Sequence, residues 1–183
     1  MDNPNLYVIS GGPGVGKTTV LDELARRGVN HAPEVARQII QEQVASGGTA
    51  VPWLDRESYI GLMFERELSS YRRHYPADQP MFSDRGLPDV LAYARLIGLG
   101  NTSELELACR SYRYAPLVFL APPWPEIYAT DSERKQDLDE GIRTYEPLRQ
   151  TYLDCGYRVC VLPKVSPDDR ADFILQRLSV ELR

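Results

Sequence analysis

The sequence predicts an α/β fold in which helices cover both faces of a parallel, five-stranded sheet. Two patterns carry this prediction. Short apolar runs alternate with longer segments of helical periodicity, and a glycine-rich stretch joins the first run to the first helical segment. The chain has 183 residues, of which 43% are apolar, so it can bury the core of one ordinary domain. We therefore expect a single domain over residues 1–183.

The predicted strands are short apolar runs bounded by turn residues. They span residues 6–10, 29–32, 80–83, 117–121 and 158–162. Helical periodicity lies between them, most clearly over residues 55–75 and 137–154, where apolar residues recur on one stripe. For the last helix, Ser166 is a plausible cap and Pro167 suits the first helical position. Because helical segments separate the strands, we expect the strands to run parallel.

The glycine-rich stretch, residues 11–18, fits the pattern G-x-x-x-x-G-K-[ST] and stands between the first strand and the first helix, as a P-loop does. Its glycines let the backbone wrap around an anion, so that amide N–H groups and the positive end of the helix point at the β-phosphate. We expect Lys17 to reach the β- and γ-phosphates and the Thr18 hydroxyl to ligate Mg²⁺. The expected nucleotide-binding residues of this loop are Gly12, Gly14, Val15, Gly16, Lys17, Thr18 and Thr19.

Composition and charge argue against several classes of function. The three cysteines form no C-x-x-C pair and only two histidines are present, so we do not expect a zinc site. We expect the three cysteines to be reduced thiols. No apolar run approaches the roughly 20 residues of a membrane span. A net charge of −5 argues against a large nucleic-acid surface. We expect a soluble, cytoplasmic protein that acts on a small molecule, and the sequence leaves its oligomeric state open.

An acidic residue follows the third predicted strand, at the edge where open α/β sheets bind ligands. There Asp84 could hold Mg²⁺, directly or through water, or it could cap the next helix. Arg85 stands where many motor ATPases place a second, water-activating acid, and this cation favours phosphate handling instead. Asp89, Tyr93 and Arg95 are candidates to line an acceptor pocket, although each also has an ordinary helical explanation.

A second acid, Glu34, follows the second predicted strand at the same edge. Its carboxylate could accept the proton of an acceptor hydroxyl, or it could favour a helix N-terminus through the dipole. Farther along, a polar segment after a proline-rich break carries Arg134 and Lys135. Such a segment could close over a triphosphate, neutralising charge and excluding water. We expect this lid over about residues 123–137.

Five segments, taken in order, resemble the small P-loop proteins called AAA-domain ATPases or predicted nucleotide kinases. These segments are residues 11–19, 33–37, 82–95, 127–136 and 156–175. That family is similar to the ribosylnicotinamide kinase domain and, more distantly, to deoxynucleoside and thymidylate kinases. The resemblance spans nearly the whole chain.

The resemblance implies a P-loop NTPase three-layer sandwich of the kinase type, with strand order 2-3-1-4-5 and a lid between the fourth and fifth strands. It also implies ATP-Mg²⁺ as phosphate donor. The roles that it implies are phosphate and metal binding for Lys17 and Thr18, metal binding for Asp84, proton acceptance for Glu34, contact with the acceptor or its phosphate for Arg85, and lid cation for Arg134. The loop that contains Pro163, Lys164 and Val165 would lie beside adenine.

These features lead to one principal hypothesis and one alternative. The principal hypothesis is an ATP-Mg²⁺-dependent phosphotransferase whose acceptor is a small hydroxyl or phosphate compound, nucleoside- or nucleotide-like. The alternative is a nucleotide-responsive ATPase or regulatory module with slow hydrolysis and no small-molecule acceptor. A polynucleotide 5′-hydroxyl kinase is disfavoured, because the chain is acidic and lacks a basic, aromatic-rich stripe.

Overall fold

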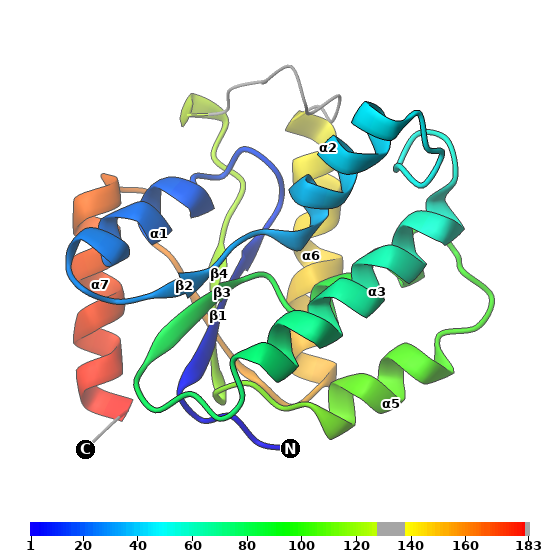
Figure 1. The fold of residues 1–183 in the computed structure, drawn as a ribbon. Coiled ribbons are helices and arrows are strands. Elements are labelled where there is room, and N and C mark those ends of the chain that lie inside the picture. Colours follow the sequence, from blue (N-terminus) through cyan, green and yellow to red (C-terminus); the bar gives the residue numbers. More distant parts are fainter. Residues whose placement is uncertain (128–137, 182–183) are drawn as a thin grey trace.

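A parallel sheet of five strands forms the centre of the molecule (Figure 1). The computed structural model describes residues 1–127 and 138–181. The strands are β1 (Leu6–Gly11), β2 (His31–Ala32), β3 (Met81–Asp84), β4 (Leu117–Ala121) and β5 (Arg158–Val161). They lie in the order β2-β3-β1-β4-β5 with every neighbouring pair parallel, which confirms the predicted kinase-type order.

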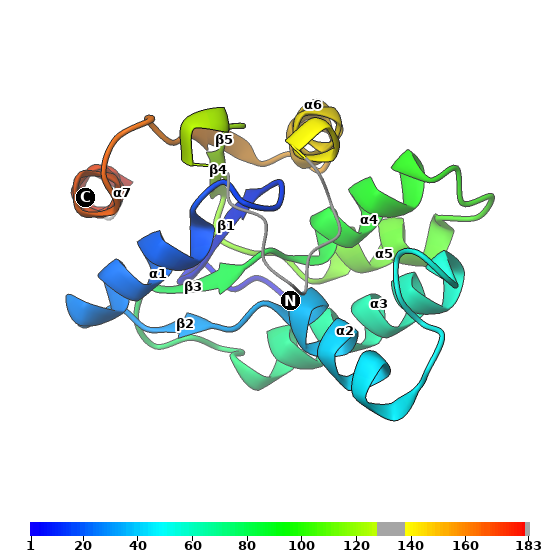
Figure 2. The same cartoon turned by 90° about the horizontal axis from the view of Figure 1, so that it is seen from above.

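Helices cover both faces of this sheet, so the molecule has three layers (Figure 2). They are α1 (Lys17–Arg26), α2 (Val35–Ser46), α3 (Arg56–Arg73), α4 (Leu87–Leu96), α5 (Ser103–Ser111), α6 (Leu138–Asp154) and α7 (Pro167–Glu181), with a short 3₁₀ turn, η1 (Pro125–Ile127), after β4. Helices α1 and α7 lie on one side, and α3, α4, α5 and α6 lie on the other (Figure 2). In the described ranges, no helix is both long and apolar enough to cross a membrane.

Alternate residues of β1 belong to two separate cores. Leu6 and Val8 pack with residues of α2, α3, α4 and α5, whereas Tyr7 and Ile9 pack with residues of α1 and α7. All six residues of β1 are buried. A central parallel strand is covered on both faces, which is why it appears in the sequence as a continuous apolar run rather than as an alternating one.

The element bounds agree closely with the sequence-based expectation. Strand β4 matches it at both ends, β1 and β5 differ by one residue at one end, and β3 is shifted by one residue at both ends. Strand β2 is shorter than expected, since it lies at the sheet edge and pairs only His31 with Phe82 and Ala32 with Ser83. The start of the last helix is confirmed, because the Asp169 N–H donates to Ser166 Oγ at 3.2 Å.

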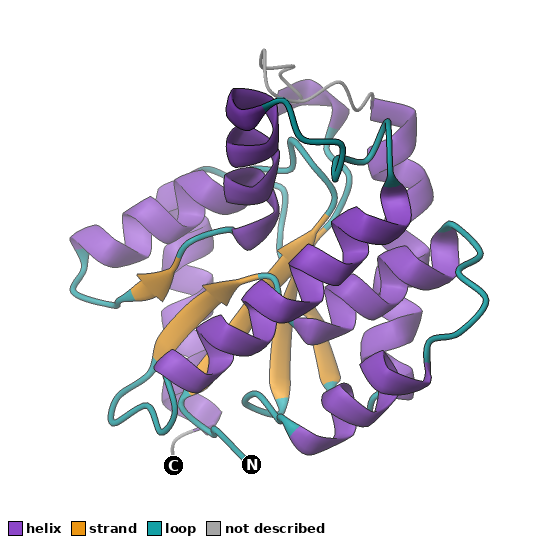
Figure 3. Cartoon of the chain, turned by 45° about the vertical axis from the view of Figure 1, so that its right-hand side comes forward, coloured by secondary structure: helices purple, strands orange, loops and turns teal. Residues whose placement is uncertain are grey.

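Parallel strands bring chemically distinct segments to one edge of the sheet. Figure 3 shows the strand arrowheads pointing toward the same end of the molecule, where loops gather. The P-loop leaves β1 there, and the chain after β2, β3, β4 and β5 leaves at the same edge. Strand β1 lies between β3 and β4. The next two strands in the chain, β2 and β3, lie on one side of β1, and the last two, β4 and β5, lie on the other. This change of direction leaves a crevice above β1, which is where open α/β sheets bind ligands.

Candidate active site

The P-loop is shaped by close packing against its neighbours. A Cβ atom on Gly11 would lie 2.7 Å from the carbonyl oxygen of Ala121, so no side chain fits there. Gly16, which precedes α1, adopts φ 83°, a left-handed conformation that favours glycine. Lys17 is only 4% exposed, and its Nζ donates to the carbonyl oxygens of Gly11 and Gly12 at 3.1 and 2.9 Å. The lysine is therefore held within the loop, an arrangement that suits the predicted phosphate-binding role.

The two threonines of the motif stand in the first turn of α1. Both are exposed, and the Thr19 hydroxyl donates to the carbonyl oxygen of Gly16 at 2.9 Å. The helix begins at Lys17, so Thr18 stands at the positive end of the helix dipole. Its exposure at this place fits the predicted role as a ligand of a phosphate-bound metal.

Asp84 ends β3 beside the strand that carries the P-loop, in register with Ile9. Its side chain is buried, and Oδ1 has no hydrogen-bond partner among the described residues. Burial raises the pKa of this carboxyl, Lys17 opposes the rise, and Glu34 adds to it. A buried carboxylate oxygen without a partner calls for an explanation, and a carboxylate oxygen is a preferred ligand of Mg²⁺. The residues present therefore fit a magnesium ion.

The acid that caps α4 is Asp89, so the capping alternative for Asp84 is wrong. Helix α4 follows Gly86, whose N–H donates to Asp89 Oδ2 at 3.0 Å. The hydroxyl of Ser10 donates to Oδ1 at 2.6 Å, and the hydroxyl of Tyr152 donates to Oδ2. Asp89 thus joins β1, α4 and α6, and its oxygen atoms are largely engaged in structural hydrogen bonds.

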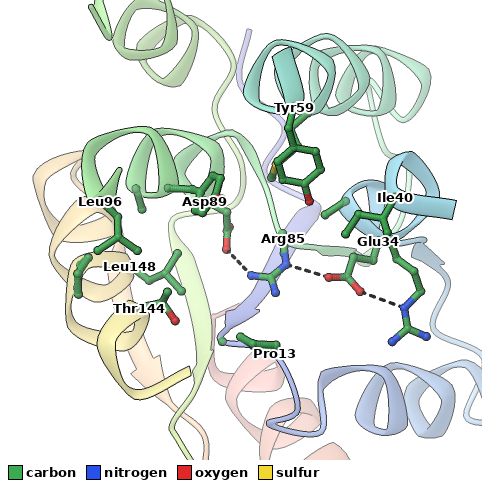
Figure 4. Close-up of a pocket in the computed structure, with 16 residues that line it drawn as sticks. Pro13, Glu34, Ile40, Tyr59, Arg85, Asp89, Leu96, Thr144 and Leu148 are labelled. Atoms are coloured by element: carbon green, nitrogen blue, oxygen red, sulfur yellow. Dashed lines mark hydrogen bonds and ion pairs between the residues drawn. The ribbon is translucent and has the colours of Figure 1, made fainter. Parts of the chain in front are cut away.

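Arg85 connects the P-loop to two carboxylates (Figure 4). Its Nε donates to Glu34 Oε1 at 3.1 Å, and its Nη1 donates to the Gly11 carbonyl oxygen at 2.8 Å and lies 3.4 Å from Asp89 Oδ1. Burial disfavours the charged guanidinium, but Glu34 and Asp89 raise its pKa, so it stays charged. Its φ is 76°, a strained value for a side-chain-bearing residue that costs about 1–3 kcal/mol. Such strain is common where a side chain is held for function.

Glu34 precedes α2, but its side chain makes no capping hydrogen bond to that helix. The carboxylate instead pairs with Arg85 at 3.1 Å and with Arg37 at 3.8 Å, and it is largely buried. Both arginines line the same pocket as Glu34. Glu34 therefore lines the pocket while it also stands at the N-cap position of α2, where the helix dipole favours its negative charge.

A pocket opens beside the P-loop, between α2, α3, α4 and α6 (Figure 4). Glu34, Arg37, Arg85 and Asp89 form its charged part. Its other lining residues, most of them apolar or aromatic, are Gly12, Pro13, Ala36, Ile40, Tyr59, Met63, Ala92, Tyr93, Leu96, Thr144, Pro147 and Leu148. An apolar wall with a few convergent polar groups is typical of a small-molecule site.

The other predicted site residues have different outcomes. Asp89 and Tyr93 line the pocket as expected. Arg95 does not, because it pairs with Glu106 and Asp154. Arg134 and most of the expected lid lie outside the described residues. Lys164 and Val165 are exposed in the loop after β5, at the predicted edge of the sheet.

Sequence reasoning missed Arg170, in the first half of α7. This arginine is 1% exposed. Its Nη1 donates to the Val15 carbonyl oxygen at 2.9 Å, and its Nε donates to the Pro163 carbonyl oxygen at 2.7 Å. The guanidinium lies over the Trp124 ring, 4.7 Å from the ring centroid. A single arginine therefore joins the P-loop, the loop after β5 and the segment after β4. Arg170 stands four residues before Ile174 and eight before Leu178, on the buried stripe of α7, so an arginine at an apolar position of the helical pattern was the signal that could have found it.

Glu67, in α3, is a third buried carboxyl group near the site, after Asp84 and Asp89. Burial raises its pKa well above the ordinary value, and Asp89 and Asp84 raise it further. The folded protein therefore binds this proton more tightly than the unfolded chain does. Stability should be lost as pH rises from about 4.5 toward the folded-state pKa.

Glu67→Gln is expected to remove this loss, because glutamine does not ionise. The variant should gain stability relative to the parent by up to about 1.4 kcal/mol for each pH unit in that window. Urea unfolding of both proteins at pH 5, 6 and 7 measures the difference. A difference that stays constant with pH would show that Glu67 does not change its protonation on unfolding.

Comparisons with known proteins agree with this geometry. A family described as an AAA domain matches residues 6–170. A search of curated proteins gave no match. Among solved structures, the NadR protein in complex with NR is similar with a TM-score of 0.72 and 21% identity, over 94% of this chain and 51% of NadR. The chain therefore spans about half the length of that protein.

Two further solved structures are similar over nearly the full length of both chains. Deoxyadenosine kinase from M. mycoides with bound dATP has a TM-score of 0.57 and 13% identity, over 95% of this chain and 99% of the kinase. Shikimate kinase from Acinetobacter baumannii in complex with shikimate has a TM-score of 0.56 and 18% identity, over 99% and 96%. Identities this low show the fold alone. The matched family and the shared kinase-type fold confirm the resemblance, and the chain belongs to the AAA-domain family of P-loop proteins.

Proposed function

We propose that the protein is an ATP-Mg²⁺-dependent phosphotransferase that acts on a small, hydroxyl-bearing acceptor of nucleoside-like size. The observation that carries the proposal is the pocket that opens directly beside Gly12 and Pro13 of the P-loop, with Glu34 and Arg85 in its wall. A hydrolase has no need of an apolar pocket next to its phosphate site. The similar structures named for deoxyadenosine kinase and for shikimate kinase support a small-molecule acceptor.

On the donor side, Lys17, Thr18 and Asp84 would hold the phosphates and the metal. Mg²⁺ would supply positive charge to the phosphate oxygens during transfer. In the described part of the chain, no three His, Cys, Asp or Glu side chains are grouped to hold a metal. This suits Mg²⁺, which usually takes one or two protein carboxylates and completes its shell with phosphate and water.

The charges of the pocket favour a hydroxyl acceptor over a phosphate acceptor. Among the described lining residues, Arg85 and Arg37 are the two cations, and Glu34 and Asp89 are the two carboxylates. Both arginines pair with Glu34, and Arg85 also approaches Asp89. A phosphate monoester would have to compete with these carboxylates, whereas a neutral compound would not. A planar ring of the acceptor could pack against the apolar wall of the pocket.

Glu34 is the carboxylate proposed to accept the acceptor's proton. Asp89 is engaged by Ser10, Gly86 and Tyr152, so it is poorly available as a base. Glu34 lies in the pocket, oriented by its ion pair with Arg85. That pairing weakens it as a base, but phosphoryl transfer passes through a loose transition state in which positioning and charge neutralisation supply most of the rate.

Glu34→Gln is expected to slow transfer by about 10²-fold, the lower end of what general base catalysis contributes. Binding of ADP-Mg²⁺ should change little, since Glu34 lies on the acceptor side. Steady-state turnover and calorimetric ADP binding, measured on the same preparation, test both halves of the prediction. Turnover equal to that of the parent would show that another group, or water, takes the proton.

The function itself is tested by measuring ADP release from ATP-Mg²⁺ with a panel of nucleosides, nucleoside monophosphates, ribosylnicotinamide and small alcohols. Lys17→Ala serves as the blank. Strong stimulation by one hydroxyl compound, with its phosphorylated product seen by mass, would establish the phosphotransferase and name the acceptor. Slow release that no compound stimulates would favour the nucleotide-responsive ATPase. Stimulation only by monophosphates would overturn the argument from pocket charge.

A further inference from the structure

Arg170 is a buried cation without an acidic partner in the described part of the chain. It is among the largest fully buried side chains, and its hydrogen bonds go to the backbone carbonyl oxygens of Val15 and Pro163. Burial lowers its pKa, and no acid among the described residues opposes that effect. A buried charge is normally paired, because removing it from water is costly. The guanidinium therefore calls for an anion that the described residues do not supply.

The position of this charge is close to the phosphate-binding turn. The Nη1 atom donates to the Val15 carbonyl oxygen, and a Cβ built on Gly16 would lie 3.4 Å from Nη1. The Nη2 atom is buried and has no hydrogen-bond partner among the described residues. Gly16 is the N-cap of α1. The guanidinium is thus packed against the turn whose amide groups are expected to face the phosphates.

The hydrogen bond to Val15 also fixes the direction of an amide group. In a planar trans peptide, the C=O of one residue and the N–H of the next point in opposite directions. Holding the Val15 carbonyl toward Arg170 therefore turns the Gly16 N–H away from Arg170. This is one of the amide groups that a P-loop directs at a phosphate. Loss of the arginine would leave that peptide free to rotate.

We propose that Arg170 is a positioning residue for the phosphate donor: it orients the Val15–Gly16 peptide so that the Gly16 N–H faces the donor's phosphates, and its positive charge acts on them across that peptide rather than by contact. The inference rests on the proposed binding of a nucleotide at the P-loop. Its hydrogen bond to Pro163 and its stacking on Trp124 tie the same arginine to the segments after β5 and β4. The same arginine therefore links the proposed donor site to the segments that follow β4 and β5.

The test measures binding of ADP-Mg²⁺ and of inorganic tripolyphosphate-Mg²⁺ by calorimetry to the parent, Arg170→Met, Arg170→Lys and Arg113→Met. Arg113 is a matched control. It lies 4.0 Å from the Tyr157 ring centroid and donates to the carbonyl oxygens of Cys109 and Cys155 at 3.2 and 2.7 Å. It precedes β4, so it lies at the sheet edge opposite the P-loop. Its loss reports the purely structural effect of removing a stacked, carbonyl-bound arginine.

Arg170→Met should weaken both ligands by about 10- to 100-fold, the range expected for lost hydrogen bonds to a charged group. Arg170→Lys should weaken them less, because it keeps the charge but cannot hold two carbonyl groups in the same way. Arg113→Met should leave both affinities unchanged. If Arg170→Met does not fold, the test rests on Arg170→Lys. The proposal is then overturned if Arg170→Lys binds both ligands as tightly as the parent does.

Two other results would also overturn the assignment. Unchanged affinity in a folded Arg170→Met variant would show a structural role only. Weaker ADP binding with unchanged tripolyphosphate binding would place the effect on the base or ribose instead. The parent separates the two kinds of failure: a parent that binds neither ligand contradicts the proposed function, whereas a parent that binds both, beside an Arg170→Met variant that binds equally well, contradicts only this inference.

Discussion

Lys17→Ala is expected to lower phosphotransfer by at least about 10³-fold, since it removes the cation that neutralises the negative charge developing on the transferred phosphoryl group. In the structure, this ammonium is buried within the loop and held by the Gly11 and Gly12 carbonyl oxygens. It is therefore placed in advance, and no mobile surface lysine can replace it. Turnover under saturating ATP-Mg²⁺ measures the loss.

The control for this variant is Arg110→Ala, which removes an exposed cation from α5. It should leave turnover unchanged, and both variants should unfold near the parental temperature. Addition of ADP-Mg²⁺ should raise the unfolding temperature of the control as it does that of the parent. Residual turnover of Lys17→Ala within tenfold of the parent would argue that phosphate is bound elsewhere.

Asp84→Asn is expected to act in opposite directions on activity and on stability. Turnover should fall by about 10²-fold or more, because the carboxylate proposed to hold Mg²⁺ is lost. The unliganded protein should become more stable at pH 7, since asparagine avoids a buried carboxylate whose pKa is raised mainly by burial. The parent loses stability as pH rises above about 3.8 toward the folded-state pKa, and the variant does not.

Thermal unfolding without ligand, together with turnover at several Mg²⁺ concentrations, tests both effects. For a chain of this size, each kcal/mol corresponds to roughly 2–4 °C in the unfolding midpoint. Asp22→Asn, an exposed acid on α1, is the matched control and should change neither quantity. A variant that lost both stability and activity would show that Asp84 has a structural role that its contacts do not reveal.

The fold and the P-loop follow from local patterns in the sequence. Strand β4 matches its prediction at both ends, because its apolar run stops at a cluster of prolines. The P-loop is a contiguous motif, so its position needed no knowledge of tertiary contacts. Strand β2 was predicted too long, since hydrophobicity does not report how far an edge strand finds a partner.

The polar contacts between distant segments could not be predicted in the same way. The sequence predicts that Glu34 and Arg85 both lie at the edge of the sheet formed by the carboxyl ends of the strands. Their ion pair, however, depends on how the start of α2 and the end of β3 meet. Asp89 appeared as one helical residue among others, although it receives hydrogen bonds from three segments. Arg170 contacts Val15 across 155 residues. Periodicity shows which face of a helix is buried, but not which polar atom will meet it.

The division of the interior by β1 has a consequence for how the protein can diversify. The pocket residues Ile40, Tyr59 and Met63 belong to or pack against the core formed with α2, α3, α4 and α5, whereas Val15 belongs to the core formed with α1 and α7. Substitutions that repack one core need not disturb the other, because a fully buried strand separates them. If the protein is the proposed phosphotransferase, its preference among acceptors can therefore change through mutations in the first core while the proposed nucleotide site is preserved.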